Sequence, residues 1–126
     1  MEYKQIKVDV KELKEYMKHK QSLVSKQLPE VVQKATLYLH GEVKKSIAHG
    51  TNAPVAVDTG RFLNSVDFAN VGENESKVFT DIEYARYIEF GTSRMNSRPH
   101  FMNTMKKEDD NLKEFFTLMI KDVCKE

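Results

Sequence analysis

The sequence predicts an α+β domain in which a small antiparallel β-hairpin packs against a long helix, with further helices at the N-terminal and C-terminal ends. Two patterns support this fold class. Apolar residues recur at helical spacing on both sides of the centre of the chain, and a short central stretch alternates around a polar turn. The length of 126 residues suits one domain, which we expect to span residues 1–126.

The first fifty residues are expected to form two helices. Asp9 and Glu12 have the spacing of a capping box, which predicts a first helix over residues 10–24. Pro29 suits the first turn of a second helix, and Gly50 is expected to end it. The second helix has a continuous apolar stripe, which we expect to face the sheet and form the core. This stripe consists of Leu28, Val32, Ala35, Leu39, Val43 and Ile47.

The middle of the chain predicts a loop followed by a hairpin. Residues 50–58 lack a periodic apolar pattern, so we expect a flexible loop there. Asp58 can cap the turn at residues 59–62, and the alternative is that the loop over residues 50–60 is a mobile arm that becomes ordered on docking to a partner. Residues 62–69 alternate in part, and the stretches VGENES and KVFTD then predict a turn and a second strand. Residues 83–91 fit a short helix and a strand about equally, so both alternatives stay open.

The last part of the chain predicts a loop and a C-terminal helix. The stretch GTSRMNSRP has the content of a loop, and Pro99 can open the helix that follows. The charged run KKEDD is either an exposed turn of this helix or a bend. The expected apolar face of the helix consists of Phe101, Met105, Leu112, Phe115, Phe116, Met119, Ile120 and Val123.

Composition argues against several classes of function. The net charge of +1 is too small to indicate a nucleic-acid binder, although residues 1–50 carry +4 (ten Lys against six acids) and residues 51–126 carry −3 (ten bases against thirteen acids). We expect no signal peptide, no membrane span and no cofactor. No metal site is predicted, because the four histidines form no ligating motif, and Cys124 stands alone. No catalytic residues are predicted.

One segment, EYARYIEFGTSRMNSRPHF from Glu83 to Phe101, contains three of the four arginines of the chain. Arginine and tyrosine are enriched at the centres of protein interfaces, so the segment can serve contacts between subunits. The alternative is intramolecular, with the aromatic side chains in the core and Arg86 or Arg61 paired to Glu89. Stacking and phosphate contact with nucleic acid is a further alternative.

Two stretches together carry a resemblance to a known family. They are VDTGRFLNSV, from Val57 to Val66, and the segment from Glu83 to Phe101. In this order and spacing they resemble the head–tail joining, or tail-completion, proteins of long-tailed phages and prophages, the gene-10-type tail-component family. The recurrent positions of the family that the resemblance assigns a mainly structural role are Asp58, Thr59, Gly60, Ser65, Tyr84, Ala85, Gly91 and Pro99.

The resemblance implies a structural protein of the phage neck, without catalysis. It would form a homo-oligomeric ring, expected to be hexameric, at the head-proximal end of the tail and join a head-completion or connector protein to a tail terminator or tail-tube protein. DNA would only pass through the lumen, and the protein would be found in virions assembled in the bacterial host cytoplasm. We expect the interface residues to be Arg61, Arg86, Glu89, Thr92, Arg94 and Arg98. The alternatives are a small mobile-element enzyme or toxin-related module, and a DNA-binding accessory factor.

Overall fold

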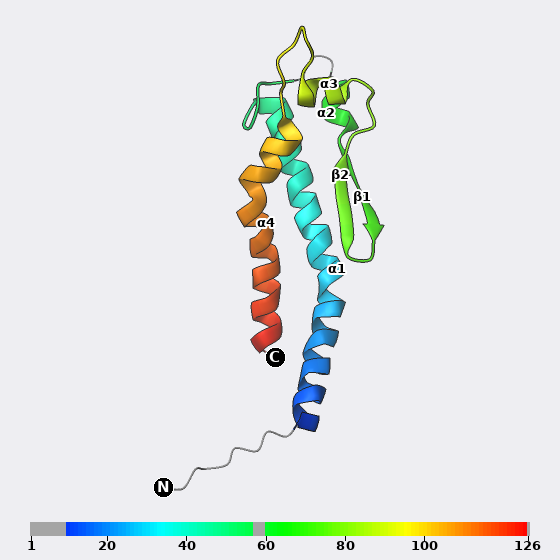
Figure 1. Ribbon diagram of the computed structural model, residues 1–126, viewed down its shortest axis with the longest axis vertical. Helices are drawn as coiled ribbons and strands as arrows, with labels where there is room; N and C mark the ends of the chain where they lie inside the picture. Colours follow the sequence, from blue (N-terminus) through cyan, green and yellow to red (C-terminus); the bar gives the residue numbers. More distant parts are fainter. Residues whose placement is uncertain (1–9, 57–59, 126) are drawn as a thin grey trace, which may run out of the picture.

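The computed structural model describes residues 10–56 and 60–125 (Figure 1). The elements in chain order are α1 (Val10–His49), α2 (Arg61–Ser65), β1 (Asp67–Gly72), β2 (Glu75–Phe79), α3 (Ala85–Phe90) and α4 (His100–Lys125). Helices α1 and α4 run antiparallel along the long axis, and the β1–β2 hairpin lies beside α1 (Figure 1). This helix-rich arrangement with one hairpin confirms the predicted α+β class.

α1 is one continuous helix of 40 residues, where the sequence predicted two helices. A proline inside a helix removes one backbone hydrogen bond and costs about 3 kcal/mol. α1 nevertheless continues through Pro29 because α4 packs along it on both sides of the proline. Lys20 Nζ donates to the carbonyl oxygen of Val123 at 2.7 Å on one side, and the rings of Tyr38 and Phe115 lie 5.7 Å apart on the other.

The core lies where the C-terminal half of α1 meets the hairpin and the short helices. Val43 and Ile47 of α1 pack there with Phe62, Val66 and Ala85, and all five residues are buried. Leu39 is half-buried at the edge of this cluster. The apolar stripe predicted for this part of α1 therefore does form the core, with its most buried residues at the Ile47 end.

The hairpin is confirmed, but it begins later than expected. β1 and β2 pair antiparallel with Phe68 opposite Val78, and the register shifts between Asn70 and Gly72. The preceding residues 61–65 form helix α2 instead of the start of a strand, and Asn64 N donates to the Gly60 carbonyl at 2.9 Å. Residues 85–90 form helix α3, which decides between the two alternatives that the sequence left open.

The C-terminal helix α4 begins as predicted after Pro99, whose carbonyl accepts a hydrogen bond from Asn103 N at 3.0 Å. The charged run KKEDD lies inside the helix and makes no bend. The expected apolar face is wrong at Met105 and Ile120, each of which is 52% exposed. α4 instead buries His100, Thr104 and Glu108, because these polar side chains find hydrogen-bond partners across the helix interface.

Residues 50–56 are packed against the start of α4, contrary to the flexible loop that the sequence predicted. Asn52 donates through Nδ2 to Thr104 Oγ1 at 2.8 Å, and its carbonyl accepts from Asn103 Nδ2 at 2.9 Å. Ala53 is buried, and Ala56 N donates to the Ile47 carbonyl at 3.1 Å. These contacts make the segment a clamp between α1 and α4. Residues 57–59 of the predicted loop lie outside the described part of the chain.

Candidate interaction surface

Helix α2, helix α3 and the 91–99 loop meet at one end of the molecule, where the loop extends beyond the helices (Figure 1). A chain of hydrogen bonds joins α2 to the residues that follow β2. Ser65 Oγ donates to the Phe62 carbonyl at 2.6 Å and lies 2.6 Å from Thr80 Oγ1, which also accepts from Ile82 N at 3.3 Å. Ser65, which the family resemblance marked, therefore positions the surface and does not itself form it.

The 91–99 loop owes its shape to Gly91 and a tight turn. Gly91 has a φ of 78°, and a Cβ atom there would lie 2.8 Å from Ser97 N, so only glycine fits without a shift of the backbone. Thr92 and Met95 pair through two backbone hydrogen bonds of 2.8 and 3.3 Å. Thr92 Oγ1 also accepts from Arg94 N at 3.2 Å. Thr92 thus shapes the loop that carries Arg94 outward.

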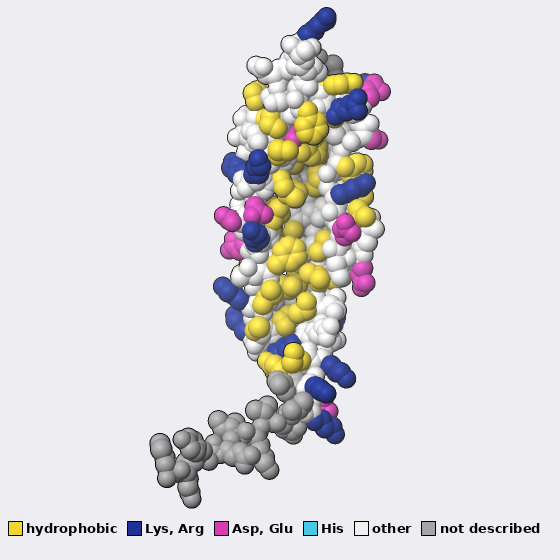
Figure 2. Space-filling model, viewed as in Figure 1, with side chains coloured by type: hydrophobic (Ala, Val, Ile, Leu, Met, Phe, Trp, Pro, Cys, Tyr) yellow, Lys and Arg dark blue, Asp and Glu magenta, His cyan; other side chains and the backbone are white. Residues whose placement is uncertain are grey.

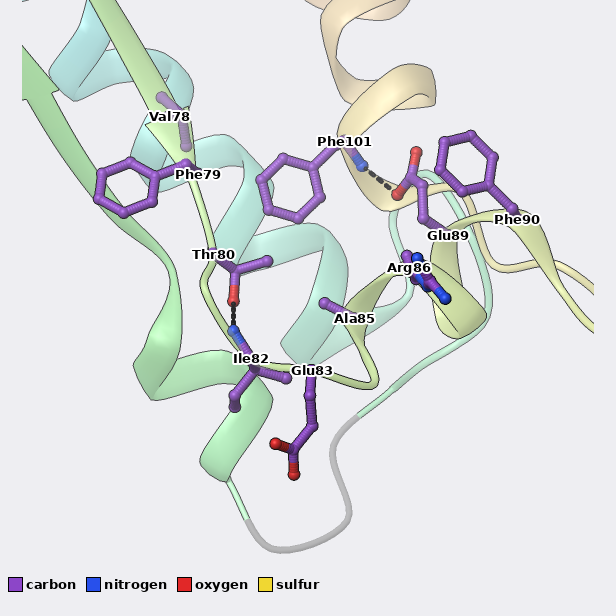
Figure 3. Close-up of a pocket in the computed structure, with 10 residues that line it drawn as sticks. All are labelled: Val78, Phe79, Thr80, Ile82, Glu83, Ala85, Arg86, Glu89, Phe90 and Phe101. Carbon is purple, nitrogen blue, oxygen red and sulfur yellow. Dashed lines mark hydrogen bonds between the residues drawn. The ribbon is translucent and has the colours of Figure 1, made fainter.

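Glu89 caps helix α4 with both of its carboxylate oxygens. Its two oxygens accept from Phe101 N and Met102 N, each at 3.0 Å. Figure 3 shows the bond to Phe101 N. Glu89 of α3 thus satisfies two free backbone N–H groups at the start of α4. The pairing of Glu89 with Arg61 or Arg86, which was the intramolecular alternative, is absent from the described residues. A hint was present in the sequence, because Pro99 stands where a helix usually has Ser, Thr, Asp or Asn as its cap.

The four arginines lie in the elements that form this end of the molecule, but they differ in their contacts. The Arg61 guanidinium lies 5.6 Å from the centre of the Tyr84 ring, and that of Arg86 lies 5.2 Å from the Tyr87 ring. Arg98 Nη1 donates to the Val55 carbonyl at 3.0 Å, so Arg98 ties the loop to the 50–56 segment. Arg94 is exposed at the tip of the loop. Among the described residues, no arginine forms an ion pair with a carboxylate.

The remaining positions of the family motif have structural roles where they are described. Gly60 adopts a left-handed conformation with a φ of 81° at the start of α2, and Ala85 is buried in the core. The Tyr84 ring packs edge-on against Phe62 at 6.4 Å. Pro99 precedes α4 and provides the carbonyl for its first turn. Asp58 and Thr59 lie outside the described residues.

A hollow of about 340 Å³ opens beside α3, between the end of β2 and the start of α4 (Figure 3). Its walls include Val78, Ile82, Ala85 and Phe101, and Glu83 and Arg86 stand at its rim (Figure 3). Phe90 is 71% exposed next to it. Apolar walls with charged side chains at the edge are typical of a surface that binds protein side chains.

A buried polar cluster lies next to the end of the molecule that contains the four arginines, which we call the arginine-bearing end. Ser46 Oγ lies 2.7 Å from Nδ1 of His100, whose side chain is fully buried. Burial lowers the pKa of the His100 imidazole. The sequence did not reveal this cluster. Polar residues that recur every four positions on a helix normally indicate the side that faces solvent.

A second buried polar group lies further along α4. Glu108 accepts hydrogen bonds from Asn111 Nδ2 and the Tyr38 hydroxyl, both at 2.7 Å. These bonds, the Asn111 bond first, lower the pKa of Glu108, and the bond to Glu108 raises the pKa of the Tyr38 hydroxyl. Glu108 is buried, so its carboxylate is not exposed to a partner protein.

Other kinds of site find no support in the described ranges 10–56 and 60–125. No group of three or more His, Cys, Asp or Glu residues in these ranges is placed to hold a metal ion. No helix in them is both long and apolar enough to cross a membrane.

The family comparison agrees with the resemblance that the two motifs suggested. Residues 11–91, more than half of the chain, match the family described as "Bacteriophage HK97-gp10, putative tail-component". The chain belongs to this family. No curated protein and no solved structure matches this family member. The match begins in α1 and ends at Gly91, so it includes both α2 and α3 of the arginine-bearing end.

Membership makes the protein a phage tail component that acts together with other phage structural proteins. Families of such tail components are generally not enzymes. The arginine-bearing end brings together exposed arginines, aromatic rings and an apolar hollow, which are features typical of protein interfaces.

Proposed function

We propose that this tail component forms a ring at the head-proximal end of the tail and joins the tail to the connector of the filled head. The ring is a homo-oligomer, expected to be a hexamer, and DNA passes through its lumen without being bound in a sequence-specific way. One face contacts a head-completion or connector protein, and the other contacts a tail terminator or tail-tube protein. Assembly takes place in the bacterial host cytoplasm, and the protein stays in the neck of the virion.

The observation that carries the proposal is a set of arginines at one end that form no ion pair with a carboxylate among the described residues. A guanidinium can form planar, bidentate pairs with carboxylates, and such pairs contribute most when a partner protein removes them from water. Arg94 extends from a loop with a fixed shape, and Arg61 lies over Tyr84 on the same end. A preformed surface of this kind favours docking to another protein.

A ring also requires that one face of a subunit match a different face of its neighbour. Exposed carboxylates are available on the outer side of α4, at Asp110 and Glu114. Asp109 on the same helix is paired with Lys113 at 2.8 Å, in an exposed pair that contributes little. We therefore expect the arginine-bearing end of one subunit to meet acidic side chains of a neighbour or of a connector protein.

The test is the double substitution Arg61→Ala and Arg94→Ala in the phage. Both side chains are exposed, so the free energy of unfolding should change by less than about 1 kcal/mol. Loss of charge pairs at a desolvated interface can cost about 2–5 kcal/mol of binding. We expect full heads and separate tails by electron microscopy in place of complete particles. The matched control replaces two exposed lysines elsewhere, Lys26→Ala and Lys107→Ala, and should leave assembly intact.

The single substitutions separate assembly from folding. Arg98→Ala removes the bond to the Val55 carbonyl and should lower the free energy of unfolding by about 0.5–1.5 kcal/mol, whereas Arg94→Ala should leave it unchanged. Complete, infectious particles from the Arg61→Ala, Arg94→Ala phage would refute the assigned interface.

A further inference from the structure

An apolar groove of about 630 Å³ runs between α4 and the hairpin, with α1 as its floor. The side chains that matter most are Leu39 and Val43 on the floor, Val78 on β2, and Phe101, Met102 and Met105 on α4. Figure 2 shows hydrophobic side chains in a band down the middle of this face, and the upper part of this band lies between α4 and the hairpin. Met102 and Met105 are about half exposed, which leaves part of an apolar surface open to solvent.

The strand beside this groove has a free edge. β1 and β2 form a two-stranded sheet, and within the described residues β2 pairs only with β1. Ser76, Lys77 and Val78 of β2 line the groove, so the unpaired side of this strand borders it. A hairpin of two strands is marginally stable in water, and a free edge is a ready template for a further strand. The groove is thus shaped for a strand with one apolar face.

The chain itself contains a segment with this pattern, ahead of α1. In the stretch QIKVD, Ile6 and Val8 alternate with Gln5, Lys7 and Asp9. As a strand, this stretch has one apolar face and one polar face, because side chains alternate in direction at period 2. A strand added to β2 needs the same division, since one side would face the groove and the other the solvent.

This segment cannot reach the groove of its own molecule. Val43 on the groove floor is 33 positions after Val10, about 50 Å along the α1 axis at 1.5 Å per residue. Ile6 is only four residues from the start of α1, which allows about 14 Å even in a fully extended chain. A strand from this segment must therefore come from another copy of the chain.

We propose that residues 5–9 of one copy add a third strand to the free edge of β2 in a neighbouring copy, with Ile6 and Val8 in its apolar groove. Peptide addition to a sheet edge combines main-chain hydrogen bonds with pockets for alternate side chains. Because donor and acceptor surfaces differ, the contact is head-to-tail and can close a ring. The inference rests on the proposed function, in which copies of the chain join side by side.

Mixed cross-linking of full-length chains tests this contact. All variants contain Cys124→Ser, which removes the single native cysteine. One chain contains Val8→Cys and a second contains Met105→Cys, and the two are mixed and oxidised. We expect disulfide-linked heterodimers on non-reducing gels. The matched control replaces Val8→Cys by Lys7→Cys, which lies on the opposite face of the same strand, and should give at least tenfold less heterodimer.

Native mass measurement on the same chains provides the second readout. Replacing Ile6→Thr and Val8→Thr keeps strand propensity but removes the apolar face, and should shift oligomers towards monomer, whereas Gln5→Thr with Lys7→Thr should not. Two outcomes would overturn the strand contact and leave the ring proposal standing. In the first, oligomers form but the Val8→Cys and Met105→Cys chains give no disulfide-linked heterodimer. In the second, Lys7→Cys gives as much heterodimer as Val8→Cys. A chain that is monomeric both in solution and in isolated tails would contradict both.

Discussion

The two halves of the α1–α4 interface are built in different ways. Near the arginine-bearing end, α4 turns His100, Thr104 and Glu108 towards α1 and the 50–56 segment. Towards its C-terminal end, α4 buries Met119 and Val123 instead. The first half is held by hydrogen bonds between particular side chains, and the second by removal of apolar surface from water together with one hydrogen bond, from Lys20 Nζ to the Val123 carbonyl.

The two halves contribute differently to the stability of the helix pair and to the accuracy with which it is positioned. Apolar packing tolerates small shifts in position, whereas each buried polar group requires its partner at a set distance and angle. The polar half lies directly beneath the loop that carries Arg94 and Arg98, and it also clamps residues 50–56. We infer that the apolar half contributes most of the stability of the helix pair, and that the polar half determines how the interaction surface is oriented.

The largest expected effect is in the apolar half. Met119 is 6% exposed, and Met119→Ala should lower the free energy of unfolding by about 2–5 kcal/mol, because it removes buried surface and leaves a cavity. Urea unfolding measures this change. Leu118, the adjacent residue, is 57% exposed, so Leu118→Ala serves as the control and should cost less than about 0.5 kcal/mol. Equal losses from both substitutions would show that α4 is rotated relative to α1.

A smaller effect is expected in the polar half. Thr104→Val keeps the shape of the side chain but leaves Asn52 Nδ2 without its acceptor, and should lower the free energy of unfolding by about 1–3 kcal/mol. Hydrogen exchange should also increase at residues 50–56, since the clamp loses one of its bonds. Thr117→Val on the exposed side of α4 is the control. No change in exchange after Thr104→Val would argue against the clamp.

The smallest effect is expected in the pH dependence of stability that the polar half contributes. His100 is buried, and its pKa in the folded protein lies below the ordinary value near 6.5. The unfolded chain therefore binds the proton more readily, so stability is lost as the pH falls below about 6.5. The loss cannot exceed about 1.4 kcal/mol per pH unit. Glu108 adds its own loss only at lower pH, because its pKa is lowered from a value near 4.5.

Thermal unfolding between pH 7 and pH 5 measures the contribution of His100. His100→Gln should flatten the pH dependence in this range. His49→Gln replaces an exposed histidine and should leave the dependence as it is in the native protein. A native protein whose stability is constant from pH 7 to pH 5 would refute the assignment of a neutral, buried His100.

The sequence singled out a segment whose residues lie together in the structure, but it did not predict the contacts that these residues make. The segment from Glu83 to Phe101 does lie at one end of the molecule, together with Arg61. Glu89 and Arg98, however, make contacts within the chain, to the start of α4 and to Val55. Residue type indicates that an arginine or a glutamate suits an interface, but it does not indicate whether an internal partner is closer.

The sequence by itself determined the features that depend on neighbours a few residues apart. The apolar spacing of α1 and α4, the polar turn of the hairpin and the glycine turn after α3 are all of this kind. Only the tertiary structure decided that α1 continues through Pro29, that α4 buries a row of polar side chains, and that Glu89 caps α4. These features depend on partners from 12 to 103 residues apart, such as Glu89 with Phe101 and Lys20 with Val123. Such partners meet only when the chain folds, so no local pattern specifies them.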